Sequence, residues 1–366
     1  MSSTIFNPSE VEESGKKSAS STTDKLRHNY LDLSKGLAIF LVIETHAREM
    51  AGTNFYGFIL KTAFYSLDRN GVLLFFLCSG ALLLSKDTFD TAKLFKRCFR
   101  LTIILSIYSI VTNSVFYIAD GKNALLEIKD ALLFNNMLTS FNYDKAIHLW
   151  FLCAYIPLLL ASPLIGLAVR SMSGKALTFF ISLLVLCGPL SKVMTTIDIQ
   201  GFELFDAGDK ATFLMYMVIG YAIHNDRLII CKTKPYLALL AAVISAIISV
   251  ICQNFMFTSG FFNENDWRVL SNYSSSIFLL PSAVFLFIFL RNAKIKSNII
   301  ERMGKCSFGI YLTHYMIMKC MFMMIPKFSS LLEKYVMSMI MALVALLLSM
   351  IVSGLLARLK LSYLVR

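Results

Sequence analysis

The feature that most constrains this chain is a series of apolar stretches, each long enough to cross a lipid bilayer. They recur from Leu31 to Ala357, with short polar connections between them. Helices suit such stretches because a helix satisfies its own backbone hydrogen bonds in lipid. Only 16% of the 366 residues are charged, whereas soluble domains carry roughly 25%. The sequence therefore predicts an all-α integral membrane protein.

The hydropathy pattern predicts a polytopic bundle of about ten transmembrane helices. The expected spans are 31–50, 67–85, 101–118, 149–169, 177–194, 211–223, 236–255, 273–290, 306–325 and 336–357. An even count places both termini on one side of the membrane. About 23 of the 35 Lys and Arg residues lie in the two tails and in the connections on that same side. Because basic residues accumulate in cytoplasmic loops, both termini are predicted to be cytoplasmic.

The domain organisation is expected to be simple. Residues 1–29 are polar and lack the apolar core of a signal peptide, so they predict a disordered cytoplasmic tail. Residues 30–366 would form one transmembrane domain without internal repeats. The stretch 124–133 is apolar at helical spacing, with charges on one side, and predicts an interfacial helix on the outer face.

Two functional classes are disfavoured. The net charge of +12 would suggest nucleic acid in a soluble protein. Here the basic residues lie mostly between apolar runs and do not interleave with aromatic ones, so no nucleic-acid partner is expected. The eight cysteines contain no C-x-x-C pair, and no H-E-x-x-H spacing occurs, so no metal site is predicted.

Four ionisable residues stand inside the first expected span, and such residues are costly in lipid and suggest function. They are Asp32, Lys35, Glu44 and His46. Eleven residues at about 100° each bring His46 about 20° past three full turns from Lys35, and about 17 Å along the axis. Asp32 falls near the same face, whereas Glu44 points largely away from His46.

The deep imidazole is the main catalytic candidate. Its ordinary pKa of about 6.5 suits a general base near neutral pH. A neighbour would have to set its protonation, and the sequence does not identify that neighbour. The alternative is that His46 is a structural hydrogen-bonding residue between helices.

Five segments, in chain order, match the signatures of a known family. They are Lys35-x10-His46, Gly71-Val-Leu-Leu-Phe-Phe-Leu-Cys-Ser-Gly80, Arg97-x-x-Arg100, His148-Leu-Trp150-Phe-Leu and Ser307-Phe-Gly-Ile-Tyr-Leu-Thr-His314. Together they resemble the bacterial acyltransferase type 3 membrane proteins, in the form without a fused extracytoplasmic domain. The region after Trp150 lacks the acidic residues of some members, so the resemblance supplies no acidic partner for His46.

The resemblance implies a multi-pass enzyme of the bacterial cytoplasmic (inner) membrane. Such an enzyme moves an acyl group, commonly acetyl, from cytoplasmic acyl-coenzyme A to a hydroxyl of an envelope glycan or a lipid-linked sugar. The acyl-coenzyme A is a donor substrate, and no bound cofactor is expected.

The resemblance also suggests roles for individual residues. His46 would be the general base. Lys35, Arg97, Arg100 and Asp32 would bind the donor, although Arg97 and Arg100 also fit ordinary positive-inside topology and Asp32 fits a helix cap. Residues that could contact the acceptor or support His46 are His148, Trp150, Tyr311, His314 and Glu44. For His148, Trp150, Tyr311 and His314, an anchoring or structural role is the default.

Two other functional classes remain open. A transporter or glycan flippase could use the intramembrane charges as a proton relay. Against it, the sequence shows neither an inverted repeat nor paired spans broken by Gly or Pro. The other class is a non-catalytic partner in a polysaccharide assembly complex.

Overall fold

A computed structural model describes residues 8–52, 58–119, 121, 146–261, 277–324, 330–359 and 361–365, and within them the chain is helical without strands. The long elements are α1 (Pro8–Met50), α2 (Phe58–Asp68), α3 (Asn70–Leu83), α4 (Thr91–Ala119), α7 (Trp150–Ser171), α8 (Gly174–Val185), α10 (Asp209–His224), α11 (Pro235–Thr258), α13 (Leu280–Asn292), α14 (Asn298–Met323) and α15 (Leu331–Arg358). The short ones are η2 (Ile147–Leu149), η3 (Leu186–Leu190), α9 (Ser191–Thr196), η4 (Phe202–Phe205), η5 (Ile229–Lys232) and η7 (Ser362–Leu364).

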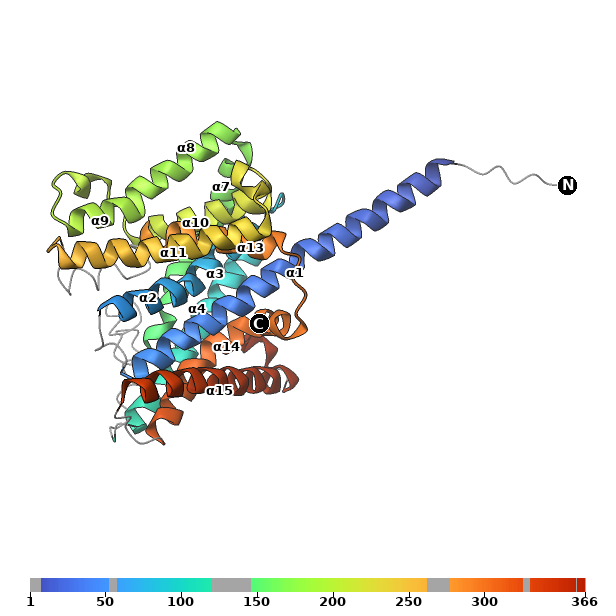
Figure 1. Cartoon of the computed structure of the whole chain (residues 1–366). Coiled ribbons are helices and arrows are strands. Elements are labelled where there is room, and N and C mark those ends of the chain that lie inside the picture. The colour runs from blue at the N-terminus through green and yellow to red at the C-terminus, as the bar shows by residue number, and fades with distance from the viewer. Residues whose placement is uncertain are drawn as a thin grey trace.

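The helix α1 runs through the middle of the bundle, and its N-terminal part projects beyond it (Figure 1). It packs against α14, α3, α15 and α13. Two glycines let α1 and α14 approach closely. A Cβ at Gly36 would overlap the Ile300 carbonyl, and one at Gly304 would overlap the Asp32 carbonyl. Small residues at such contacts let two backbones meet in lipid, so these glycines bring α14 beside the charged face of α1.

A second glycine contact joins α3 to α10. A Cβ at Gly80 would overlap the Met217 carbonyl, and one at Gly220 would overlap the Leu77 carbonyl. The neighbouring Ser79 hydroxyl donates to the Phe75 carbonyl at 2.8 Å. The segment ending in Ser79-Gly80 therefore serves helix packing.

Six helical segments of the described chain are long and apolar enough to span a membrane. They are Phe58–Leu83, Thr91–Ile118, Ile147–Ser171, Gly174–Thr196, Pro235–Thr258 and Leu332–Arg358. Residues 31–50 and 306–323 of two further expected spans are helical too, but they carry ionisable residues such as Glu44 and His314. α10 and α13 are shorter, with 16 and 13 residues. The multi-pass helical architecture is confirmed, and the count of ten and the cytoplasmic termini stay predictions.

Three further expectations concern the N-terminal tail, the interfacial helix and the span at 177–194. Residues 8–29 have helical backbone that continues into the first expected span, and the division into tail and domain stays a prediction. The interfacial helix expected at 124–133 lies outside the described residues. The span expected at 177–194 is interrupted, since the π-turn η3 contains Pro189 and separates α8 from α9. The candidate span Phe58–Leu83 is also divided, between α2 and α3.

A buried ion pair links α1 to α2. Arg48 is 1% exposed and binds Asp68, which is equally buried. Breaking a buried ion pair by removing one partner costs about 3–5 kcal/mol. We expect Asp68→Ala to lower the thermal unfolding midpoint of the purified protein markedly. Substituting the exposed Asp87 in the same way should leave that midpoint unchanged, and equal midpoints for the two variants would contradict this role.

Candidate active site

A cavity of about 680 Å³ lies between α1, α3, α4, α7 and α14. The polarity of its lining changes along its length. The lining is charged near the start of α4, apolar in the middle, and rich in aromatic and imidazole rings near His46. The lining includes Asp32, Lys35, Val42, His46, Phe75, Leu82, Lys86, Arg97, Arg100, Leu101, His148, Trp150, Phe151, Tyr155, Lys305, Phe308 and Tyr311.

The charged part of this lining, which we call the basic mouth, consists of Lys35, Lys86, Arg97, Arg100 and Lys305 together with Asp32. All four residues that the sequence proposed for donor binding are among them. Lys86 and Lys305 were missed individually, although they belong to the two connections richest in basic residues. The end of the bundle that holds this mouth is called the basic end below.

The polar contacts of the basic mouth hold its side chains in place. Lys35 Nζ lies 3.1 Å from Asp32 Oδ1. Arg97 donates from Nη2 to the Tyr155 hydroxyl at 3.2 Å. Arg100 Nε is buried and has no hydrogen-bond partner among the described residues. Five cations against one carboxylate give the mouth a net positive charge, and guanidinium groups bind phosphate oxygens in pairs.

Lys35 and His46 line the same cavity, as their spacing on one helix predicts. Between their levels the walls are apolar, with Val42, Phe75 and Leu101 among the lining residues. An apolar passage of this kind excludes water and strengthens electrostatic interactions within it.

Three histidines from separate elements meet at the inner end of the cavity. The His46 ring on α1 lies 5.6 Å from the His314 ring on α14, between centroids, and His314 lies 5.3 Å from the His148 ring on η2. The Tyr315 ring contacts both His46 and His148, at 5.0 and 4.9 Å. The structure thus places His148 and His314 beside the main catalytic candidate.

His314 and Tyr311 both form hydrogen bonds to backbone carbonyls, and the structural role predicted for them stays a prediction. His314 Nδ1 lies 2.7 Å from the Tyr311 carbonyl, and the Tyr311 hydroxyl donates to the His148 carbonyl at 2.6 Å. The second bond fastens η2, which directly precedes α7, to α14. Trp150 and His148 line the cavity itself, at the start of the candidate span Ile147–Ser171, and the anchoring role expected for them stays a prediction.

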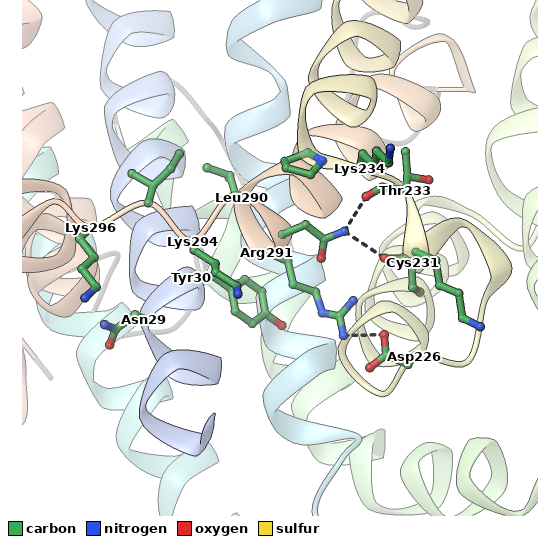
Figure 2. Close-up of a pocket in the computed structure, with 14 residues that line it drawn as sticks. Asn29, Tyr30, Asp226, Cys231, Thr233, Lys234, Leu290, Arg291, Lys294 and Lys296 are labelled. Atoms are coloured by element: carbon green, nitrogen blue, oxygen red, sulfur yellow. Dashed lines mark hydrogen bonds and ion pairs between the residues drawn. The ribbon is translucent and has the colours of Figure 1, made fainter. Parts of the chain in front are cut away.

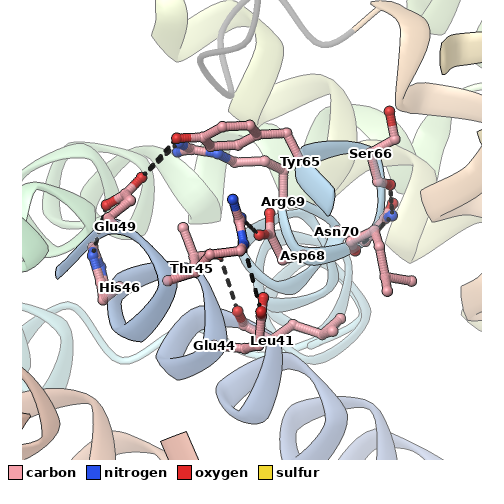
Figure 3. Close-up of polar contacts among 12 residues, drawn as sticks. Leu41, Glu44, Thr45, His46, Glu49, Tyr65, Ser66, Asp68, Arg69 and Asn70 are labelled. Atoms are coloured by element: carbon pink, nitrogen blue, oxygen red, sulfur yellow. Dashed lines mark hydrogen bonds and ion pairs between the residues drawn. The ribbon is translucent and has the colours of Figure 1, made fainter. Parts of the chain in front are cut away.

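His46 has an acidic neighbour that the sequence reasoning missed. Glu49 Oε2 lies 3.3 Å from His46 Nδ1. The other oxygen of Glu49 accepts hydrogen bonds from Arg69 Nη2 at 3.1 Å and from the Tyr65 hydroxyl at 3.2 Å (Figure 3). Residues three apart on a helix are neighbours, so the spacing of His46 and Glu49 was the available signal.

Glu44 contacts Arg48 on the same helix. Its Oε1 lies 3.5 Å from Arg48 Nε, and it is not among the cavity-lining residues. The supporting role that the sequence allowed for Glu44 stays a prediction. The helical angle had already indicated that its side chain points away from His46.

The arrangement combines an anion-binding entrance, an apolar passage and an imidazole with a carboxylate beside it. A carboxylate next to one ring nitrogen fixes the tautomer and leaves the other nitrogen able to accept a proton. The site therefore suits proton abstraction at the end of a long ligand that carries phosphates at its other end.

Comparison with known proteins gives the family of the chain. No curated protein and no solved structure matches the chain. A family model described as an acyltransferase domain matches residues 28–358, which is nearly the whole sequence and includes every element of the cavity. The chain therefore belongs to this acyltransferase family, as its five motifs had indicated.

Proposed function

We propose that this protein is a membrane O-acyltransferase, most simply an O-acetyltransferase, that uses acyl-coenzyme A as donor and a hydroxyl of a bacterial envelope glycan or lipid-linked sugar as acceptor. The observation that carries the proposal is the single cavity that joins the basic mouth to His46. Coenzyme A has phosphates at one end and the thioester at the other, joined by an extended arm. The predicted separation of about 17 Å between Lys35 and His46 along the helix suits that length.

In the proposed reaction, Lys35, Arg97 and Arg100 bind the phosphates and the thioester lies near His46. Glu49 favours a proton on His46 Nδ1, so that Nε2 is the base. Nε2 removes the proton of the acceptor hydroxyl as its oxygen attacks the thioester carbonyl carbon. The carbon–sulfur bond then breaks, and the departing thiolate takes up the proton from Nε2. The products are an ester and free coenzyme A.

The proposal also gives the orientation of the protein. The basic end faces the cytoplasm, where acyl-coenzyme A is made, and the chain lies in the bacterial inner membrane with both termini cytoplasmic. The excess of Lys and Arg in the tails and the connections on the same side supports this orientation. The acceptor would approach His46 from the side of His148 and Trp150.

The test is an assay with purified protein in lipid nanodiscs, acetyl-labelled acetyl-coenzyme A and envelope glycan from a strain that lacks the gene. Formation of an alkali-labile glycan ester supports the proposal. Movement of a lipid-linked sugar across proteoliposomes without ester formation would support the flippase instead, and the acyltransferase assignment would then be wrong.

Replacing the two arginines by lysines separates donor binding from membrane topology. Arg97→Lys and Arg100→Lys keep the charge, but they lose the paired hydrogen bonds to phosphate. Each variant is expected to raise KM for acyl-coenzyme A about tenfold, with kcat changed much less. Lys96→Arg, outside the cavity, is the control and should leave KM unchanged. If KM also stays unchanged in both arginine variants, the basic mouth does not bind the donor.

A further inference from the structure

A second basic concavity lies at the basic end, apart from the catalytic cavity. It has a volume of about 620 Å³ and lies between the middle of α1 at Asn29 and Tyr30, the segment from the end of η5 to the start of α11, and the end of α13 (Figure 2). We call it the basic groove. Tyr30 of α1 lines this groove, whereas Asp32 and Lys35, less than two turns further along, line the catalytic cavity. α1 therefore contributes to both concavities.

The groove carries a strong excess of positive charge. Its lining includes Lys232, Lys234, Arg291, Lys294 and Lys296. Its one carboxylate, Asp226, is bound to Arg291 at 2.6 Å. The four lysines form no ion pair with the described residues. Their charges are therefore free to bind an anion.

Two hydrogen bonds from one side chain join the segments that line the groove. Asn292 Nδ2 donates to the carbonyls of Cys231 and Thr233, both at 2.9 Å. These bonds hold the segment that carries Lys232 and Lys234 against the end of α13, which precedes Lys294 and Lys296. The lysines of the two segments thus line one concavity.

The surface beside the groove is apolar and exposed. Only 17% of the most apolar stretch of α11 is buried, the lowest value of the six candidate spans. Tyr236 and Leu240 at its start are 61% and 53% exposed, and Ile295 at the groove is 37% exposed. A soluble anion would gain nothing from these side chains, whereas the acyl chains of a lipid would pack on them.

We infer that the basic groove binds the phosphate head group of an anionic phospholipid, with the acyl chains lying along the exposed face of α11. Basic pockets between helices on the cytoplasmic side of a membrane are suited to such head groups. This inference does not depend on the proposed acyltransferase activity.

The experiment titrates the purified full-length protein in a neutral detergent with short-chain phosphatidylglycerol and records the thermal unfolding midpoint. The matched neutral lipid is short-chain phosphatidylcholine. We expect a saturable rise in the midpoint with phosphatidylglycerol and little change with phosphatidylcholine. An equal rise with both lipids would overturn the inference.

Two variants with equal charge loss locate the site. The triple variant Lys232→Gln, Lys234→Gln, Lys294→Gln is expected to bind phosphatidylglycerol at least about tenfold more weakly than the unsubstituted protein. The control variant Lys93→Gln, Lys96→Gln, Lys175→Gln removes three exposed lysines at the same end and should bind it as before. Equal weakening in both would show a general charge effect and overturn the inference. A folding defect in the first variant would appear as a lower midpoint without lipid.

Soluble phosphates provide the remaining comparison. Inorganic phosphate and free coenzyme A are added at increasing concentration to the protein saturated with phosphatidylglycerol. We expect neither to displace the lipid from the basic groove. If either compound displaces the lipid, and the triple lysine variant no longer shows this displacement, the groove binds a soluble phosphate ligand. That result would contradict a lipid site.

Discussion

Replacing His46 by alanine is expected to lower the rate of acyl transfer by roughly 10²–10⁴-fold, the usual effect of removing a positioned general base. The structure gives the reason. His46 lies at the inner end of the cavity, and within it no other side chain combines an imidazole with an adjacent carboxylate among the described residues. The measurement is kcat with saturating acetyl-coenzyme A and glycan, together with donor affinity by equilibrium binding.

Donor affinity should change little in His46→Ala, because the phosphates bind far from the imidazole. The matched control is His224→Ala, which removes another buried histidine, one bonded to the Tyr30 hydroxyl at 2.7 Å and outside the cavity. The control should keep its kcat. If His46→Ala turns over at a rate close to that of the unsubstituted protein, His46 is not the base.

Replacing Glu49 by glutamine is expected to lower kcat by roughly 10²-fold, with KM for the donor unchanged, because an amide cannot hold the imidazole in one tautomer as a carboxylate does. Glu49 is a positioning residue, since it acts through His46. Its own orientation depends on Arg69 and Tyr65, which bind its other oxygen. The expected signature is a kcat effect without a KM effect.

Glu44→Gln is the matched control for this prediction. It changes a buried carboxylate on the same helix, but that carboxylate contacts Arg48 and not His46. Both variants are expected to lower the thermal unfolding midpoint, and only Glu49→Gln should lower kcat. An equal kcat loss in the two variants would mean that Glu49 acts through stability alone.

Local geometry was predictable where one helix supplies all the residues. Lys35 and His46 line one cavity because eleven residues make just over three full turns. The same periodicity correctly turned Glu44 away from His46. Glu49 obeys the same rule, since it lies three residues after His46 on the same helix and contacts it.

Contacts between distant segments were not predictable from the sequence in the same way. His148 and His314 approach each other because η2 lies against α14, and the Tyr311 bond to the His148 carbonyl fixes that arrangement. The close approach of α1 to α14 depends on Gly36 and Gly304. A glycine in an apolar run permits such contact without saying which helix will make it. These two histidines were identifiable from the sequence only because they belong to the family motifs, since helical periodicity does not connect them to His46.

The span boundaries show a similar limit. The expected spans at 177–194 and 236–255 fall within the apolar segments Gly174–Thr196 and Pro235–Thr258. The ends of a continuous apolar run can be predicted because hydropathy changes sharply there. The helix pair α2–α3 begins at Phe58, whereas the expected span began at residue 67. The expected start was too late because Lys61, Asp68 and Arg69 interrupt the hydropathy of this segment. Asp68 is nevertheless buried, since Arg48 neutralises it.

The most direct measurement of the central claim is photocrosslinking with an acyl-coenzyme A that carries a diazirine at the end of its acyl chain, followed by peptide mapping. The single cavity predicts labelling of the peptides around His46, His148–Phe151 and Tyr311, suppressed by excess unlabelled acyl-coenzyme A and in the Arg97 and Arg100 lysine variants. Competable labelling confined to the basic groove or to the lipid-facing side of α11, with none around His46, would contradict the claim that the donor reaches the imidazole through this passage.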